Sequence, residues 1–269
     1  MKVSRAGLGA AVLVLSLTAT ACGDSEEDKK ITVGIKFDQP GLGFKEENGT
    51  FSGFDVDVAR YVAGELGYEP KQVEFKQVSS NDRELLLQYG EVDYVVASYS
   101  ITEKRKAKVD FAGPYFTAHQ DLLVRSGEKD IKKGADLNGK RLCSVTGSTS
   151  AQNVKEKVAP KADLMELGSY SECAVALKDT FLDAMTTDDA ILAGFAAQKK
   201  YQGQFRLVGL DLSTENYGIG VKKGEDELRG KIDAALKKMV QDGAWAKAVG
   251  THFGSAGYRH DPAPALAGN

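Results

Sequence analysis

The feature that most constrains the fold is a regular alternation of short apolar strands with helical patterns, which runs from Ile31 to about Val221. In the segment after Gly53, apolar residues recur at i, i+3, i+4 and i+8 spacing, and Gly67 follows as a stop signal. Strand segments such as VEFKQV and DYVVAS stand between the helical segments. This alternation predicts an α/β fold with mostly parallel sheets.

The N-terminus has the layout of a bacterial lipoprotein signal peptide. Lys2 and Arg5 precede an uncharged run that ends in small residues just before Cys22. A membrane anchor helix is the alternative, but a span needs about 20 apolar residues, and glycines and a late Thr-Ala-Thr-Ala stretch interrupt this run. We therefore expect residues 1–21 to be removed, Cys22 to be acylated, and residues 22–30 to form a flexible tether.

The net charge and the length of the chain limit the classes of protein to which it can belong. The net charge is −3 at pH 7, and loss of Lys2 and Arg5 with the signal peptide leaves 33 basic against 38 acidic residues, or −5. An acidic chain of this kind gives no indication of a nucleic-acid partner. Roughly 240 residues remain, which is enough for one large domain or two smaller ones.

The chain has three cysteines. With Cys22 lipidated, Cys143 and Cys173 are left as an even pair in an oxidising compartment, which predicts a disulfide; two buried free thiols are the alternative. Neither cysteine belongs to a CxxC motif, and the three histidines lie far apart in the sequence. We expect no metal site and no cofactor.

Four stretches resemble the polar amino-acid substrate-binding proteins of bacterial ABC transporters: GTFSGFDVDVARYVAGELG, SYSITEKRKAKVDFAGPYF, VTGSTS and LDAMTTDDAILAG. The second stretch is the most specific, because Ser/Thr-x-Thr-x-x-Arg followed by Val-Asp-Phe and Pro-Tyr is a signature of that family. VTGSTS alone is a weak signal. With the helical C-terminus, the resemblance covers essentially the whole mature chain.

This resemblance implies the type II periplasmic-binding fold, in which two α/β lobes are joined by two hinge segments. Each lobe is a mixed, mostly parallel sheet flanked by helices. We expect lobe 1 to comprise residues 31–120 and 217–256, lobe 2 to comprise residues 121–216, and residues 257–269 to form a flexible tail. A ligand would dock on lobe 1, and lobe 2 would close over it.

A pocket for an amino acid needs a cation and backbone N–H groups for the α-carboxylate, and an acid for the α-ammonium. By the resemblance, Arg105 holds the α-carboxylate together with the backbone N–H groups of Ser100 and Thr149. Asp188 pairs with the α-ammonium, together with the Ser98 carbonyl and the Ser100 hydroxyl. The alternatives are an exposed arginine in the charged segment EKRKAK and a helix N-cap role for the aspartate.

Two further cations bear on the choice of ligand. In the family, the residue at the end of the first strand points at the ligand side chain, and here it is Lys36; Arg83 lies where acidic-amino-acid binders place an arginine. Two cations there imply a second ligand carboxylate, because an unpaired buried charge is costly. An exposed lysine and a solvated arginine are the alternatives. Other candidates for the cleft wall, each with packing as its alternative role, are Gln39, Phe54, Ser80, Tyr99, Ser148 and Tyr170.

The stretch TVGIKFDQPGLG also resembles the glutamate-binding lipoproteins of Gram-positive actinobacteria. The sequence therefore predicts a monomer, lipid-anchored on the outer face of the cell membrane, that captures glutamate or aspartate. It would present the ligand to the permease subunits of an ABC importer with a cytoplasmic ATPase. Glutamine or another polar amino acid is the alternative ligand. A sensor domain and a dehydratase-like enzyme of the same fold are less favoured, because no signalling segment is fused and the pocket segments lack a histidine.

Overall fold

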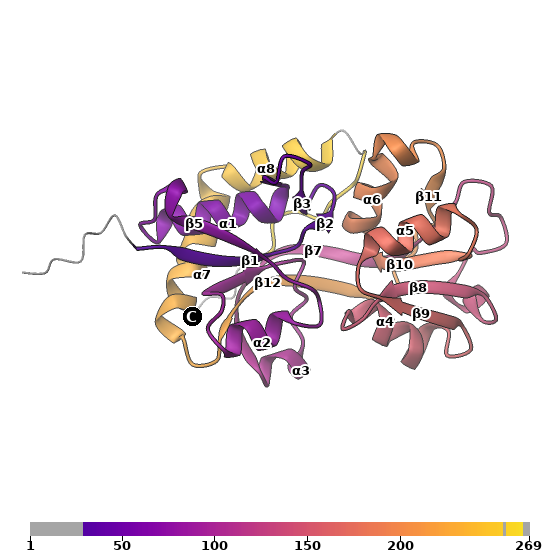
Figure 1. Cartoon of the computed structure of the whole chain (residues 1–269), viewed down its shortest axis with the longest axis horizontal. Coiled ribbons are helices and arrows are strands. Elements are labelled where there is room, and N and C mark those ends of the chain that lie inside the picture. Colours follow the sequence, from indigo (N-terminus) through magenta and orange to yellow (C-terminus); the bar gives the residue numbers. More distant parts are fainter. Residues whose placement is uncertain (1–28, 255–256, 266–269) are drawn as a thin grey trace, which may run out of the picture.

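The structure, a computed structural model, describes residues 29–254 and 257–265. Two lobes lie side by side along the long axis of the molecule, and strands β7 (Val109–Arg125) and β12 (Thr214–Lys222) run from one lobe into the other (Figure 1). The alternation of strands and helices predicted from the sequence is confirmed.

Lobe 1 contains most of the N-terminal half and the last two helices. Its elements are β1 (Ile31–Ile35), β2 (Asp38–Gln39), β3 (Gly43–Lys45), β4 (Phe51–Ser52), α1 (Phe54–Glu65), β5 (Val73–Gln77), α2 (Arg83–Gln88), β6 (Tyr94–Val96), α3 (Glu103–Lys106), α7 (Asp226–Gln241) and α8 (Ala244–Phe253).

Lobe 2 is built from the middle of the chain. Its elements are β8 (Arg141–Val145), α4 (Thr149–Asn153), a π-helical turn (Val154–Val158), β9 (Asp163–Leu167), α5 (Tyr170–Lys178), β10 (Ala184–Asp188), α6 (Asp189–Ala197) and β11 (Phe205–Leu207). Short 3₁₀ turns lie at Pro70–Gln72, Gly134–Leu137 and Lys199–Tyr201.

One large sheet runs through both lobes in the order β5-β1-β6-β12-β7-β10-β8-β9, with β11 also beside β7, while β2, β3 and β4 form a separate small sheet. Strand β1 pairs in parallel with β5 and β6, and β8 pairs in parallel with β9 and β10. Up to His119, β7 pairs with β12; from Gln120 onward it pairs with β10 and then β11. The change of partner lies beside the predicted lobe boundary at residues 120–121, and that division itself stays a prediction.

An aromatic cluster fills the core of lobe 1 beneath α1 and α8. The ring centroid of Phe54 lies 5.2 Å from that of Phe116, 6.0 Å from that of Trp245 and 5.9 Å from that of Phe253. Phe54 is fully buried there because the first turn of α1 faces the sheet. The prediction that Phe54 lines the cleft is therefore wrong.

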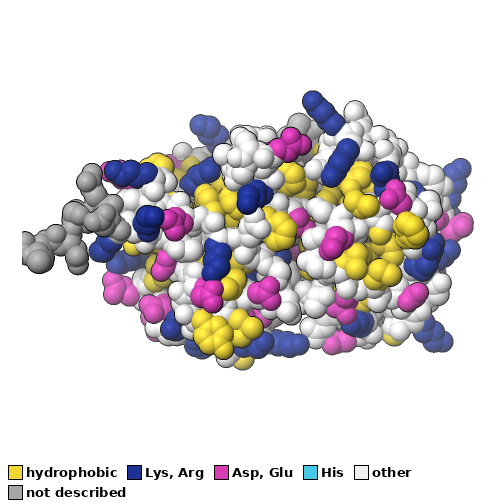
Figure 2. Space-filling model, viewed as in Figure 1, with side chains coloured by type: hydrophobic (Ala, Val, Ile, Leu, Met, Phe, Trp, Pro, Cys, Tyr) yellow, Lys and Arg dark blue, Asp and Glu magenta, His cyan; other side chains and the backbone are white. Residues whose placement is uncertain are grey.

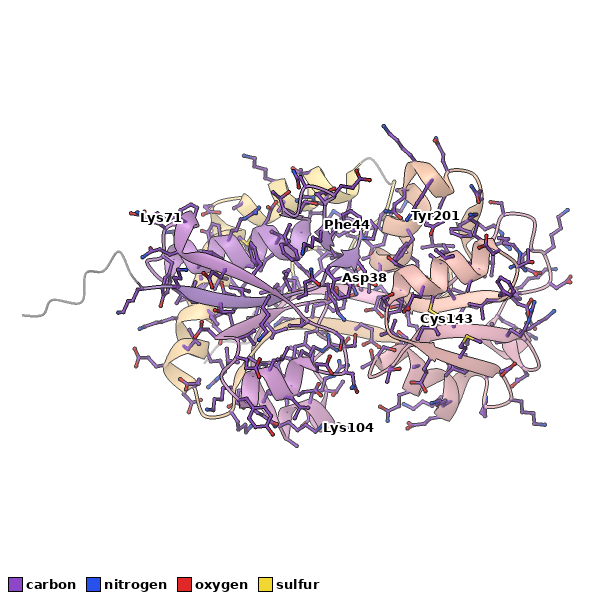
Figure 3. The ribbon with its side chains drawn as sticks, viewed as in Figure 1. Asp38, Phe44, Lys71, Lys104, Cys143 and Tyr201 are labelled. Atoms are coloured by element: carbon purple, nitrogen blue, oxygen red, sulfur yellow. A yellow bond between two sulfur atoms is a disulfide. The ribbon has the colours of Figure 1, made fainter. Side chains whose placement is uncertain are left out.

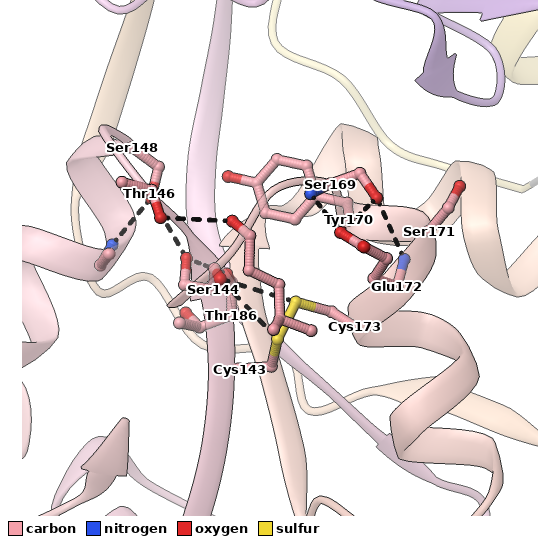
Figure 4. Close-up of a disulfide and its surroundings, with 12 residues drawn as sticks. Cys143, Ser144, Thr146, Ser148, Ser169, Tyr170, Ser171, Glu172, Cys173 and Thr186 are labelled. Carbon is pink, nitrogen blue, oxygen red and sulfur yellow. Dashed lines mark hydrogen bonds between the residues drawn. A yellow bond between two sulfur atoms is a disulfide. The ribbon is translucent and has the colours of Figure 1, made fainter. Parts of the chain in front are cut away.

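The predicted disulfide is present. It joins Cys143 in β8 to Cys173 in α5, with their Cα atoms 5.6 Å apart (Figure 4). Strand β8 leads into the loop that carries Ser148, and α5 begins at Tyr170. The covalent link therefore fixes two lobe 2 segments that carry candidate ligand-binding residues.

Two of the last described residues contact other parts of the chain. The hydroxyl of Tyr258 donates a hydrogen bond of 2.9 Å to Asp189 at the start of α6. Nε2 of His119 in β7 lies 3.2 Å from Oδ2 of Asp261. These contacts join Tyr258 to lobe 2 and Asp261 to the strand between the lobes, while the flexible tail at residues 257–269 stays a prediction.

The predicted signal peptide, the lipidation site Cys22 and most of the tether lie outside the described residues. Among the helices that the structure describes, none is long and apolar enough to cross a membrane. Acidic and basic side chains are interspersed over the face in Figure 2, and neither sign dominates it.

Candidate functional site

A small cavity lies between the two lobes, and the side chains around it leave little free space inside it. Side chains from both lobes line it, and most of them were predicted from the sequence: Gln39, Ser80, Arg83, Ser98, Ser100 and Arg105 from lobe 1, and Ser148, Thr149, Tyr170 and Asp188 from lobe 2.

Arg105 is a buried cation that contacts both lobes. Its backbone N–H donates to Oγ1 of Thr102, the N-cap of α3. Nη1 donates to the Ser100 carbonyl at 2.7 Å, and Nη2 donates across the cleft to the Gly147 carbonyl at 3.0 Å. Burial and then the charge of Arg83 lower its pKa to about 10, so it remains protonated at neutral pH. The alternative of an exposed arginine is wrong, because the side chain is buried; its role at the α-carboxylate stays a prediction.

Asp188 ends β10 and occupies the N-cap position of α6, but its side chain makes no capping hydrogen bond. Its carboxylate instead accepts a hydrogen bond of 2.5 Å from the Tyr217 hydroxyl and one of 3.3 Å from Oγ of Ser150. Burial and then the charge of Glu215 raise its pKa to about 7. A cationic group in the cavity would favour the ionised form of this carboxylate.

Lys36 directly follows β1 and is only 3% exposed, so the alternative of an exposed lysine is wrong. Its Nζ donates to Oγ of Ser80 in the cavity wall at 2.8 Å, while Lys36 itself is not among the residues that line the cavity. Burial and then the charge of Arg83 lower the pKa of Lys36 to about 7. An anion bound beside this amine would favour its protonated form.

Arg83 opens α2 and is 2% exposed, which rules out the solvated alternative. Its Nη1 donates to the Ala97 carbonyl at 3.0 Å, while its buried Nε has no hydrogen-bond partner. Its Cζ atom lies 3.8 Å from the ring centroid of Tyr99, and that of Arg105 lies 5.1 Å from it. The Tyr99 ring therefore makes cation–π contacts with both guanidinium groups. Its predicted place in the cavity wall is wrong.

Ser98 has a backbone conformation that is rare outside glycine, with φ at 46°. Asp55, in the first turn of α1, holds it: the carboxylate accepts hydrogen bonds from the Ser98 N–H at 2.8 Å and from its hydroxyl at 3.3 Å. Oε1 of Gln39 accepts a second hydrogen bond from the same hydroxyl, at 2.6 Å. The positioning role of Asp55 was missed, although the residue lies in the motif GFDVD that carried the family resemblance.

Glu215 and Ser150 were also missed. Glu215 lies on β12, where its carboxylate accepts a hydrogen bond of 2.8 Å from Oγ1 of Thr149, the first residue of α4. The same Thr149 oxygen lies 3.5 Å from Oγ of Ser100 in lobe 1. The isolated glutamate in TENYG and the serine in VTGSTS gave no signal of such contacts, because they depend on how the lobes meet.

Comparisons with known proteins agree with this architecture. The family model of bacterial extracellular solute-binding proteins, family 3, matches residues 31–255. A glutamate-binding protein of Corynebacterium efficiens is 43% identical, over 93% of this chain and 90% of its own. An ABC transporter glutamine-binding protein of Bacillus subtilis is also 43% identical, over 82% of this chain and 80% of its own.

Among solved structures, an ancestral arginine-binding protein bound to glutamine matches with a TM-score of 0.78 and 40% identity, covering 84% of this chain and 98% of that one. These relatives are named as binding proteins and not as enzymes. Together with the two-lobed fold and the cavity between the lobes, the match shows that the chain belongs to family 3 of the bacterial extracellular solute-binding proteins.

Proposed function

We propose that this protein captures glutamate, or aspartate, in the cavity between its lobes. The observation that carries the proposal is the pair of buried cations, Lys36 and Arg83. Among the described residues, neither has a carboxylate within 4 Å, and Nε of Arg83 has no partner at all. A buried charge without a counter-charge is costly, so the ligand's side-chain carboxylate is the group that best completes this end of the cavity.

The α-groups of the ligand would have partners of their own. Arg105 would bind the α-carboxylate, and the N–H of Thr149 adds a donor because the first residues of a helix have no intrahelical acceptor. Asp188 would pair with the α-ammonium. An amino acid bound in this way contacts lobe 1 through Arg105 and lobe 2 through Asp188, which favours the closed arrangement of the lobes.

Glutamine is the second candidate. With its pKa near 7, Lys36 can lose its proton, and a neutral amine accepts a hydrogen bond from a side-chain amide. The Bacillus subtilis relative is named as a glutamine-binding protein, whereas the Corynebacterium relative is named for glutamate. The charge of Arg83, which no loss of the lysine proton removes, favours glutamate.

We further propose that the protein is lipid-anchored on the outer face of the cell membrane through Cys22, and that it delivers its ligand as a monomer to the permease of an ABC importer. β7 and β12 would be the two hinge strands. Support comes from the signal-peptide pattern before Cys22 and from the name of the Bacillus relative. Labelling of growing cells with a palmitate analogue should mark the wild type and leave Cys22→Ala unmarked.

The test of ligand choice is isothermal titration of the protein without residues 1–24, after unfolding and refolding to remove bound ligand. Glutamate, aspartate and glutamine are titrated separately. Tight glutamate binding with much weaker glutamine binding is the expected result. A preference for glutamine would refute the argument from the two cations, and no binding of any of the three would refute amino-acid capture.

A further inference from the structure

We propose that Asp38 is a closure latch: a lobe 1 side chain that binds the start of helix α5 in lobe 2 and holds the closed form together without contacting the ligand. The proposal rests on the proposed capture of an amino acid between closing lobes. Figure 3 labels Asp38 at the junction of the two lobes. Asp38 does not line the cavity, although its neighbour Gln39 does.

The contact is specific. Oδ2 of Asp38 accepts hydrogen bonds from the backbone N–H groups of Tyr170, at 2.7 Å, and Ser171, at 3.3 Å. These residues open α5, where N–H groups have no intrahelical acceptor and the helix dipole favours a negative charge. Within lobe 2, Oγ of Ser169 already accepts from the next N–H, that of Glu172. Lobe 1 therefore supplies the acceptor that lobe 2 lacks.

A second observation is that the same segment of lobe 1 packs closely against helix α6 of lobe 2. Pro40 follows Asp38 by two residues, and its carbonyl packs against Gly194 in α6. A Cβ atom at position 194 would come within 2.0 Å of that carbonyl oxygen, so only glycine allows the approach. The β2–β3 turn thus docks on the start of α5 and the middle of α6 together.

Asp38 also lies near Lys36, and its negative charge favours the protonated lysine. A change at Asp38 could therefore weaken glutamate through Lys36 alone. The two roles differ in their ligand dependence. Loss of a latch weakens glutamate and glutamine equally and speeds dissociation of both, whereas loss of charge on Lys36 weakens only the acidic ligand.

The experiment compares wild type, Asp38→Ala and Asp38→Asn by stopped-flow dissociation of glutamate and of glutamine from the mature protein. We expect Asp38→Ala to release both ligands about ten- to a hundredfold faster, since hydrogen bonds to a charged group are lost. Asp38→Asn should lie between, because it keeps an uncharged acceptor. Unchanged dissociation of both ligands, or a loss confined to glutamate, would overturn the latch.

A glycine pair provides a matched control. Gly194→Ala should weaken both ligands about five- to a hundredfold, because the added methyl group overlaps Pro40 only when the lobes close. Gly230→Ala, in helix α7 with open space around the added Cβ, should leave affinity unchanged. Both changes raise helix propensity, so neither should lower the melting temperature of the ligand-free protein. Unchanged ligand affinity in Gly194→Ala would contradict the docking of Pro40 against α6.

The effect of Asp38 on lobe closure can be measured without any ligand, so this test does not depend on the proposed function. Spin labels at Lys104→Cys in lobe 1 and Lys157→Cys in lobe 2, both exposed beside the cleft, report the distance between the lobes. We expect Asp38→Ala to shift the distribution of the ligand-free protein toward longer distances. If no amino acid binds the wild type, amino-acid capture fails while this shift still supports the latch; identical distributions would refute it.

Discussion

The replacement Lys36→Met removes one buried charge next to Ser80 of the cavity wall while keeping a long, unbranched side chain. Glutamate should lose affinity and glutamine should lose little. The reason is that Lys36 has no carboxylate partner within 4 Å among the described residues, so a ligand carboxylate is its expected counter-charge. With methionine in place, that carboxylate would be buried against an apolar side chain and would keep only Arg83 as its cation.

The size of the effect follows from the surroundings of Lys36. Removing one partner of a buried charge pair costs about 2–5 kcal/mol. Arg83 remains beside the carboxylate, so we expect the lower part of that range, about 2–3 kcal/mol, or a 30- to 150-fold rise in the Kd for glutamate. Because the pKa of Lys36 is about 7, half of the amines are already protonated at pH 7. The expected rise in the Kd for glutamate is therefore reduced by only a factor of about two. Glutamine should lose at most about one hydrogen bond, roughly fivefold or less.

Isothermal titration of both ligands into wild type, Lys36→Met and the control Lys237→Met measures these changes. Lys237 is an exposed lysine of α7, so its replacement should change neither affinity. The informative quantity is the ratio of the glutamate and glutamine Kd values. Equal losses for the two ligands in Lys36→Met would refute the reasoning, since they would show that the lysine supports the fold and does not read a ligand charge.

Three further outcomes are expected. Arg105→Ala should weaken glutamate, aspartate and glutamine alike by about 2–5 kcal/mol in titrations, and a loss restricted to one ligand would contradict its role at the α-carboxylate. Because the pKa of Lys36 is about 7 in the empty cavity and a bound anion raises it, glutamate affinity should fall by up to tenfold per pH unit above pH 7. The pKa of Asp188, also about 7, is lowered by a bound ammonium, so affinity for every amino acid should fall below pH 7; a flat profile from pH 5 to 9 would refute both assignments. Reducing the bond between Cys143 and Cys173, which are 30 residues apart, should lower the unfolding free energy by about 3–4 kcal/mol in denaturant melts and leave affinity unchanged; an unchanged melt would contradict this.

The elements of the fold could be predicted because their signals are local. The spacing of apolar residues after Gly53 corresponds to α1, and the stop signal at Gly67 lies just beyond its end. The charged residues of the site could be predicted because a motif fixed their positions, as for Arg105 in the signature stretch. Burial of Lys36 and Arg83 was an expectation that rested on the same resemblance, and the structure places both in the interior.

Residues whose roles depend on the meeting of distant segments could not be predicted. Phe54 was a candidate for the cleft wall with packing as its alternative role, and its ring packs against Phe116 in the core of lobe 1. Tyr258 lies in the segment predicted to be a flexible tail, but its hydroxyl donates a hydrogen bond to Asp189 of lobe 2. In both cases the deciding contact comes from residues more than 60 positions away in the sequence.

In the proposed closure of the lobes, the charges around the cavity would make the closed form depend on the ligand. Asp38 favours closure whether or not a ligand is present, because it gives α5 acceptors that lobe 2 lacks. Closure of an empty cavity would bury Lys36, Arg83 and Asp188 together, and burial disfavours the charged forms of the lysine and the aspartate. A ligand with two carboxylates and one ammonium reduces that cost, since its side-chain carboxylate would lie beside both Lys36 and Arg83 and its ammonium beside Asp188. The ligand would therefore shift the equilibrium between the open and closed forms by the difference in free energy between unmatched and matched buried charges. Because the contacts of Asp38 also favour the closed form, a smaller part of that free energy is needed for closure.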